Sequence, residues 1–143
     1  MLEDIIFLGI KNRLLAEVWE ETCRLALPAL GETGEILSGY GGWSPAGRYW
    51  GGSGPEWDVV AQSQDKSVFL LGEVKWHEGP VSEKDLDKIH AGLLAKGQLR
   101  LAGGGAFKDT VYVLFVPECR PGLKRHGRPC RIVTAEDVIR ALG

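Results

Sequence analysis

The sequence predicts an α/β domain with an αβββαβ core, in which helices flank a mixed central sheet. Three observations support this prediction: an amphipathic helical pattern comes first, two segments rich in valine and aromatic residues follow it, and a continuous apolar strand comes after a second helical pattern. The length of 143 residues suits one hydrophobic core, because a second would need roughly another hundred residues. We therefore expect residues 1–143 to form a single domain.

The composition limits the class of protein. Apolar residues make up 44% of the chain and charged residues 25%, which is typical of globular proteins and excludes a disordered or fibrous one. The net charge of -2 excludes nucleic-acid binding by bulk positive charge, so such binding has to be local. The apolar run of residues 5–10 is far shorter than a bilayer requires, and three cysteines without a CxxC pair predict reduced thiols. We expect a cytoplasmic protein with no membrane contact.

An amphipathic helix is predicted over residues 11–27, and Pro28 is expected to follow its end. Apolar residues recur there at helical spacing and form a wide arc that suits a buried face. The arc contains Leu14, Leu15, Val18, Trp19, Cys23, Leu25 and Ala26. Glu20 and Glu21 lie at opposite edges of this arc, where a carboxylate can reach the rim of the core.

Two later helices carry capping signals. Ser82 and Asp85 resemble a capping box at the start of a helix whose apolar face extends to Leu101. Thr134 and Asp137 give the same signal for a short closing helix.

Five strands are predicted between these helices. Residues 48–50 form a short strand, and residues 56–62 and 68–76 form a hairpin, because polar residues suited to a tight turn separate them. Residues 111–116 are continuously apolar, which indicates a strand in a sheet covered on both faces. Residues 131–133 form the last strand.

The far end of the hairpin carries a charged cluster. With a two-residue turn at 65–66, Asp58 lies opposite Glu73, and Glu56 lies opposite Lys75. Side-chain alternation puts these four residues on one face. It gives the other face only apolar residues, namely Trp57, Val59, Ala61, Val68, Leu70, Val74 and Trp76.

Adjacent carboxylates need compensation, since like charges directly opposite cost up to about 1 kcal/mol and desolvation adds to that cost. A divalent cation supplies it well, because carboxylate oxygens are the ligands that Mg²⁺ prefers. Lys75 points the same way as Glu73 and can polarise a water molecule. The plainer alternative is a solvated strand end, where Lys75 and Glu56 form a surface ion pair.

A resemblance to the PD-(D/E)XK nuclease superfamily, whose members have a restriction-endonuclease-like fold, lies in residues 56–61 and 72–76. These segments read EWDVVA and GEVKW, an acidic residue on one strand followed by Glu-x-Lys on the next. More narrowly, residues 14–117 resemble an uncharacterised domain at the C-terminus of archaeal-type P-loop ATPases. No segment matches GxxxxGK[ST], so the resemblance does not imply nucleotide hydrolysis.

The resemblance implies metal-assisted hydrolysis of phosphodiesters. Asp58, Glu73 and the carbonyl oxygen of Val74 would hold Mg²⁺ or Mn²⁺ near the scissile phosphate. Lys75 would orient the attacking water, and Glu20 on the first helix would either reach the site through a metal-bound water or steer the lysine. The implied catalytic residues are therefore Glu20, Asp58, Glu73 and Lys75.

Two further groups of residues are candidates for contacting nucleic acid. Lys124, Arg125 and Arg128 lie in a basic loop, for which a solvated surface loop is the alternative. Arg48 and Trp50 lie beside the hairpin, where an aromatic ring can stack on a base or simply pack in the core. The expected partners are DNA, a separate P-loop ATPase chain and a second copy of this chain. The alternative function is a non-catalytic module of the same fold that binds a protein partner.

Overall fold

Eight helices and strands make up the part of the protein that the computed structural model describes, which is residues 2–33, 36–49, 56–76, 79–96, 109–125 and 128–143. In chain order these elements are α1 (Leu2–Thr33), β1 (Gly47–Tyr49), β2 (Trp57–Gln62), β3 (Val68–Val74), α2 (Glu83–Lys96), β4 (Asp109–Phe115), β5 (Arg131–Val133) and α3 (Ala135–Leu142). The predicted order of one helix, three strands, a helix and a strand is confirmed.

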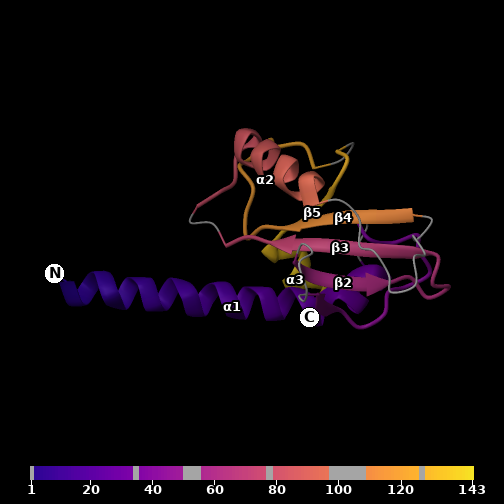
Figure 1. Ribbon diagram of the computed structural model, residues 1–143, viewed down its shortest axis with the longest axis horizontal. Coiled ribbons are helices and arrows are strands. Elements are labelled where there is room, and N and C mark those ends of the chain that lie inside the picture. The colour runs from indigo at the N-terminus through magenta and orange to yellow at the C-terminus, as the bar shows by residue number, and fades with distance from the viewer. Residues whose placement is uncertain (1, 34–35, 50–55, 77–78, 97–108, 126–127) are drawn as a thin grey trace.

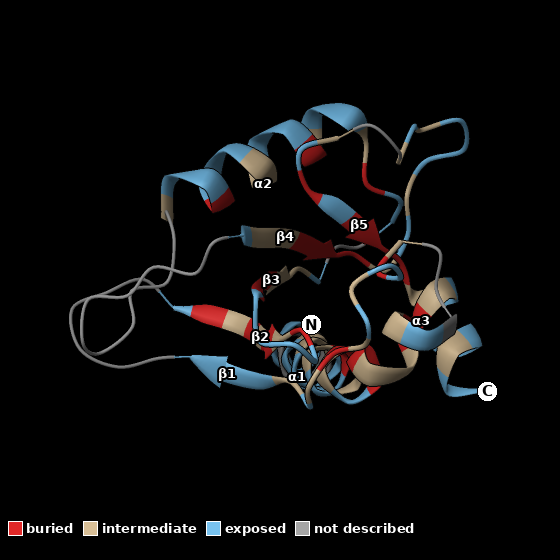
Figure 2. Ribbon diagram, turned by 90° about the vertical axis from the view of Figure 1, so that its right-hand side faces the viewer, coloured by how far each residue is buried: buried red, intermediate tan, exposed pale blue. Residues whose placement is uncertain are grey.

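Helices cover both faces of a mixed five-stranded sheet (Figure 1). The strand order is β1-β2-β3-β4-β5, with the first three strands antiparallel and the pairs β3–β4 and β4–β5 parallel. Helix α2 lies over one face, while α1 and α3 lie against the other (Figure 2). Two apolar cores result, one on each face of the sheet. The predicted α/β class with a mixed, helix-flanked sheet is confirmed.

The predicted register of the hairpin is confirmed. Val59 pairs with Gly72 and Gln62 pairs with Phe69, as a two-residue turn at 65–66 predicts, and the pairs between them follow the same register. The turn is held by the Asp65 carboxylate, which accepts hydrogen bonds from the N–H and hydroxyl of Ser67. Continued towards the start of β2, this register brings the Asp58 and Glu73 positions to the same end of the sheet.

The predicted faces of the hairpin are wrong at Trp57. Val59 and Ala61 pack in the core beneath α1, as expected, but Trp57 packs in the core beneath α2 together with Leu71. The pairing of β2 with β1 also shifts register in this region, between the partners of Gly47 and Tyr49. Such an irregularity interrupts the alternation of side chains. A prediction that assumes strict alternation therefore puts Trp57 on the wrong face.

Helix α1 is longer than predicted and contains Pro28. Proline removes one helical hydrogen bond, at a cost of about 3 kcal/mol, but the next turn buries Leu30 in the core and so favours continuing the helix. Of the predicted apolar arc, Trp19, Cys23 and Ala26 are buried. The other members are exposed: Val18 and Leu25 share the side of the helix that faces away from the core, and the N-terminal part of α1 projects beyond the sheet (Figure 1). These exposed members are Leu14, Leu15, Val18 and Leu25.

No helix among the described residues is long and apolar enough to cross a bilayer.

Both capping boxes are present. The Asp85 carboxylate accepts from the N–H of Ser82, and the Asp137 carboxylate accepts from the N–H of Thr134. Helix α2 ends at Lys96, and the predicted extension to Leu101 lies outside the described residues.

Gly72 in β3 lies closely packed against neighbouring side chains. A Cβ atom there would lie 3.1 Å from the side chains of both Phe115 and Val59. We expect Gly72→Val to lower the free energy of unfolding by about 1–3 kcal/mol, because the two neighbours would have to move. Urea denaturation measures the change. Gly47→Val is the control, since a Cβ at Gly47 meets no atom within 4 Å; equal losses in the two variants would contradict the prediction.

Candidate active site

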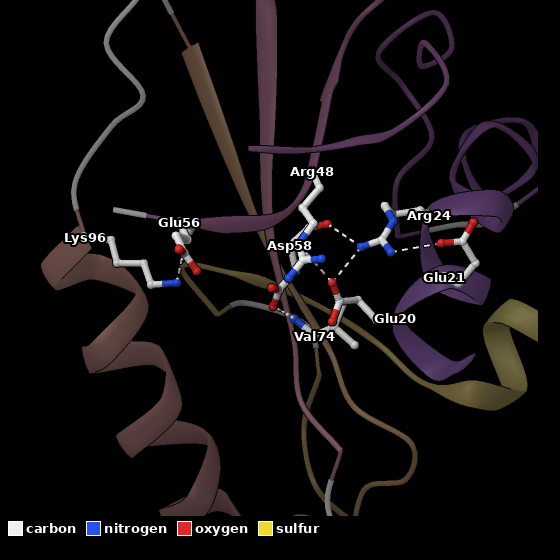
Figure 3. A network of polar contacts seen from close by, with 8 residues as sticks. All are labelled: Glu20, Glu21, Arg24, Arg48, Glu56, Asp58, Val74 and Lys96. Atoms are coloured by element: carbon white, nitrogen blue, oxygen red, sulfur yellow. Dashed lines mark hydrogen bonds and ion pairs between the residues drawn. The ribbon is translucent and has the colours of Figure 1, made fainter. Parts of the chain in front are cut away.

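The carboxylate of Asp58 is fixed to the neighbouring strand. Its Oδ2 atom accepts a hydrogen bond of 2.8 Å from the backbone N–H of Val74 (Figure 3). Val74 stands between Glu73 and Lys75, so this bond attaches the acid of β2 to the centre of the Glu-x-Lys segment of β3. The structure therefore brings the first predicted acid to the second motif.

Glu73 and Lys75 extend in the same direction from the end of β3. The Lys75 Nζ atom lies 3.5 Å from Oε1 of Glu73. The Glu73 side chain is only 12% exposed, whereas that of Lys75 is 43% exposed. Lys75 is also anchored through its backbone, because its N–H bonds to the carbonyl of Phe115 and its carbonyl accepts from Trp19 Nε1. The carboxylate is thus held near the core while the ammonium group remains accessible to solvent.

Glu20 reaches the site through Arg24. The Arg24 guanidinium donates to the Glu20 carboxylate at 2.7 Å and to the backbone carbonyl of Asp58 at 3.0 Å. It also pairs with Glu21 at 3.0 Å, and Arg48 Nε lies 3.6 Å from Glu20 (Figure 3). Both predicted helical acids therefore converge on one arginine, which connects α1 to the backbone of β2.

The pKa of Asp58 is raised above its ordinary value. Burial is the main cause, and the negative charges of Glu20 and Glu73 add to it. The hydrogen bond from Val74 and the positive charge of Lys96 act in the opposite direction without cancelling the rise. The fold therefore keeps an ionised carboxylate here at a cost in stability, which is a common property of functional sites.

This cost predicts that Asp58→Asn stabilises the protein in the absence of divalent cations. A raised pKa means that the folded state holds the proton more tightly than the unfolded state, so ionisation above that pKa lowers stability. Asparagine can still accept the Val74 hydrogen bond. We expect a higher Tm than wild type at pH 7, a difference that shrinks as the pH falls through the raised pKa, and no difference well below the ordinary pKa of 3.8, where both states are protonated.

Asp137→Asn is the matched control for this measurement. The Asp137 carboxylate pairs with Arg125 and accepts hydrogen bonds from the N–H and hydroxyl of Thr134, so losing its charge should lower Tm at pH 7. A lower Tm for Asp58→Asn at pH 7 would contradict the stated origin of the raised pKa.

Sequence reasoning missed Lys96, the last residue of α2. Its Nζ atom donates at 2.9 Å to Oε1 of Glu73 and at 2.9 Å to the carbonyl of Glu56, and it lies 5.0 Å from the ring centroid of Trp57. No sequence signal links it to the hairpin, because it is 23 positions after Glu73 and belongs to a separate helix. Arg24 was missed too, although its spacing of four from Glu20 and three from Glu21 predicts ion pairs on a helix.

A cleft of about 510 Å³ opens beside Glu73, between α2 and the end of β3. Its charged lining is mixed, with Lys75, Lys88 and Lys96 facing Glu73 and Asp85. A larger hollow of about 770 Å³ lies at the opposite end of β2, around Trp43 and Ser63. The smaller cleft is the one that borders the predicted site residues Glu73 and Lys75.

The structure places the predicted nucleic-acid contacts in different surroundings. Arg125 pairs with Asp137 and donates to the carbonyl of Ile132, while Arg128 lies 3.4 Å from Glu83. Lys124 is exposed. Arg48 is exposed next to Glu20, and Trp50 lies outside the described residues. Only Arg48 therefore lies beside the carboxylates, and a DNA contact by any of these residues remains a prediction.

The donor set at this end of the sheet suits a hard divalent cation. Asp58 and Glu73 offer carboxylate oxygens, and one or two carboxylates completed by water and phosphate are the usual protein ligands of Mg²⁺. Within the described residues, no three His, Cys, Asp or Glu side chains come together as a metal-binding group. Binding would therefore draw on other oxygens as well, for which the Val74 carbonyl remains the predicted source.

Comparison with known proteins assigns the chain to a protein family. Residues 4–89 match the model of DUF234, described as archaeal and bacterial proteins of unknown function. The chain belongs to this family. The DUF234 match includes α1 from residue 4 onwards and the whole hairpin, with Glu20, Asp58, Glu73 and Lys75, whereas Lys96 lies beyond it. No curated protein and no solved structure matches the chain. The predicted resemblance to an uncharacterised archaeal-type domain is thus confirmed at the level of a family of unknown function.

Proposed function

We propose that the protein is a metal-dependent nuclease of the PD-(D/E)XK class, with a restriction-endonuclease-like core, that hydrolyses DNA phosphodiesters with Mg²⁺ or Mn²⁺. The observation that carries the proposal is the 2.8 Å hydrogen bond from the Val74 N–H to Asp58. It joins an acid of one strand to the Glu-x-Lys segment of the next, at the end of a sheet whose elements follow the αβββαβ order.

Each side chain has a role that its contacts support. Asp58 and Glu73 supply the negative charge that binds the cation, and Asp58 is held in place by the Val74 N–H. Lys75 extends into the solvent-accessible cleft, so its ammonium group can position a water molecule and stabilise the negative charge that develops on the phosphate. Glu20 acts at a distance, because it orients Arg24, which in turn holds the backbone of Asp58.

Asp58 and Glu73 would hold a divalent cation, which would supply Lewis-acid polarisation of the phosphate. The carboxylates of Asp58 and Glu73 provide the negative charge that would attract this cation. Both carboxylates are partly buried at one sheet end, and the negative charge of Glu73 adds to the cost of ionising Asp58. A bound cation would remove that cost, so cation binding should stabilise the folded protein.

A cleavage assay tests the proposal. Purified protein is incubated with supercoiled, linear and branched DNA in Mg²⁺, in Mn²⁺ and in EDTA. We expect nicking or cleavage with either metal, none in EDTA, and none from Glu73→Gln. Absence of cleavage on every substrate, or cleavage that persists in Glu73→Gln, would count against the proposal.

The second candidate function is a non-catalytic module that binds a protein partner, such as a separate P-loop ATPase chain. The exposed apolar residues of α1 favour it, because Ile5 and Ile6 in its N-terminal part and Leu14 and Val18 further along are more than half exposed. Loss of partner binding on Leu14→Ser, combined with no DNA cleavage by the wild type, would support this function over the first.

A further inference from the structure

Lys96 lies directly against Glu73, one of the two carboxylates of the proposed cation site. Its ammonium group donates to the Glu73 carboxylate at 2.9 Å and to the backbone carbonyl of Glu56 at 2.9 Å, and it lies over the face of the Trp57 ring. Two hard oxygen ligands and a π face form a good environment for a positive charge. The side chain is only 26% exposed, less than that of Lys75.

Lys75 and Lys96 differ in how they meet the same carboxylate. Lys96 forms a direct hydrogen bond with Oε1 of Glu73, whereas Lys75 lies 3.5 Å from that atom. Because Oε1 already accepts a hydrogen bond from Lys96, a metal ion that uses this oxygen has to replace that hydrogen bond.

We infer that Lys96 is an internal counter-ion that competes with the divalent cation for Glu73 and so sets the affinity of the site. This inference rests on the proposed function, since it concerns the cation of the same site. In the metal-free protein, Lys96 neutralises Glu73 and fastens the end of α2 to the sheet. Cation binding releases the ammonium group into the adjoining cleft, where it faces the same space as Lys75.

The test measures Mn²⁺ binding by isothermal titration calorimetry, without DNA, for wild type, Lys96→Gln and Lys96→Arg. The Lys96→Gln side chain keeps a donor for the Glu56 carbonyl but has no charge, so it removes competition with little loss of structure. We expect about tenfold tighter Mn²⁺ binding in Lys96→Gln and wild-type affinity in Lys96→Arg. A purely structural role would instead weaken binding. Circular dichroism confirms the fold of each variant.

Lys88→Met is the matched control, because it removes a positive charge from the same cleft and from the same helix as Lys96. We expect its affinity to change by less than about twofold. Equal tightening in Lys88→Met and Lys96→Gln, or unchanged or weaker binding in Lys96→Gln, would overturn the inference while leaving a metal site in place. No Mn²⁺ binding by wild type or by Lys96→Gln would instead overturn the metal site itself, and the inference with it.

Discussion

Replacing Lys75 by methionine is expected to reduce the rate of DNA cleavage by about 10²- to 10⁴-fold. The accessible ammonium group of Lys75 lies 3.5 Å from Glu73 at the edge of the cleft, where it can act on the water and on the phosphate. Methionine fills a similar volume without the charge. Single-turnover cleavage at saturating Mn²⁺ measures the effect, so that a change in cation affinity does not enter the rate.

Lys66→Met is the control for Lys75→Met. Lys66 is an exposed lysine at the turn of the same hairpin, at the opposite end from the carboxylates. We expect its cleavage rate to remain within about twofold of wild type. Retention of the wild-type rate in Lys75→Met would remove Lys75 from the mechanism, although Asp58 and Glu73 could still bind a cation.

Arg24→Met is expected to lower the free energy of unfolding by about 2 kcal/mol. The guanidinium is 16% exposed and neutralises Glu20, whose charge otherwise acts on Asp58. Breaking a partly buried pair leaves an uncompensated carboxylate, which costs more than losing a surface pair. The double variant Glu20→Gln, Arg24→Met removes that carboxylate and should recover about half of the loss. Urea denaturation in EDTA measures all three proteins.

Arg140→Met provides the comparison for Arg24→Met. Its ion pair with Glu136 is of similar length, 2.8 Å, but both side chains are more than 70% exposed. Its removal should change stability by less than about 0.5 kcal/mol. A double variant as unstable as Arg24→Met alone would show that Arg24 acts through its packing and its bond to the Asp58 carbonyl, and not by neutralising Glu20.

The hairpin and its register could be predicted because the relevant information is local. A polar two-residue turn at 65–66 sets the pairing, and the pairing fixes that Asp58 and Glu73 reach the same end of the sheet. The Glu-x-Lys spacing similarly fixes that Lys75 lies on the side of Glu73, since side chains two residues apart share a face.

The remainder of the site depends on tertiary packing. Trp57 crosses to the core beneath α2 where β1 and β2 lose their register, and strict alternation gives no sign of this. Lys96 reaches Glu73 only because α2 crosses the sheet in a particular direction, which no local pattern specifies. The continuation of α1 through Pro28 is also decided by burial of residues beyond it, against the local preference to stop.

The most direct test of whether Asp58 and Glu73 hold one cation together is a Mn²⁺ titration monitored by the rise in Tm. It compares the wild type with Asp58→Asn and Glu73→Gln. Glu136→Gln, a substitution on the exposed face of α3, serves as the control. We predict that Mn²⁺ raises the Tm of the wild type and the control, and that each site substitution weakens binding by at least about tenfold. An undiminished rise in both site variants, or no rise in the wild type, would contradict the shared cation site.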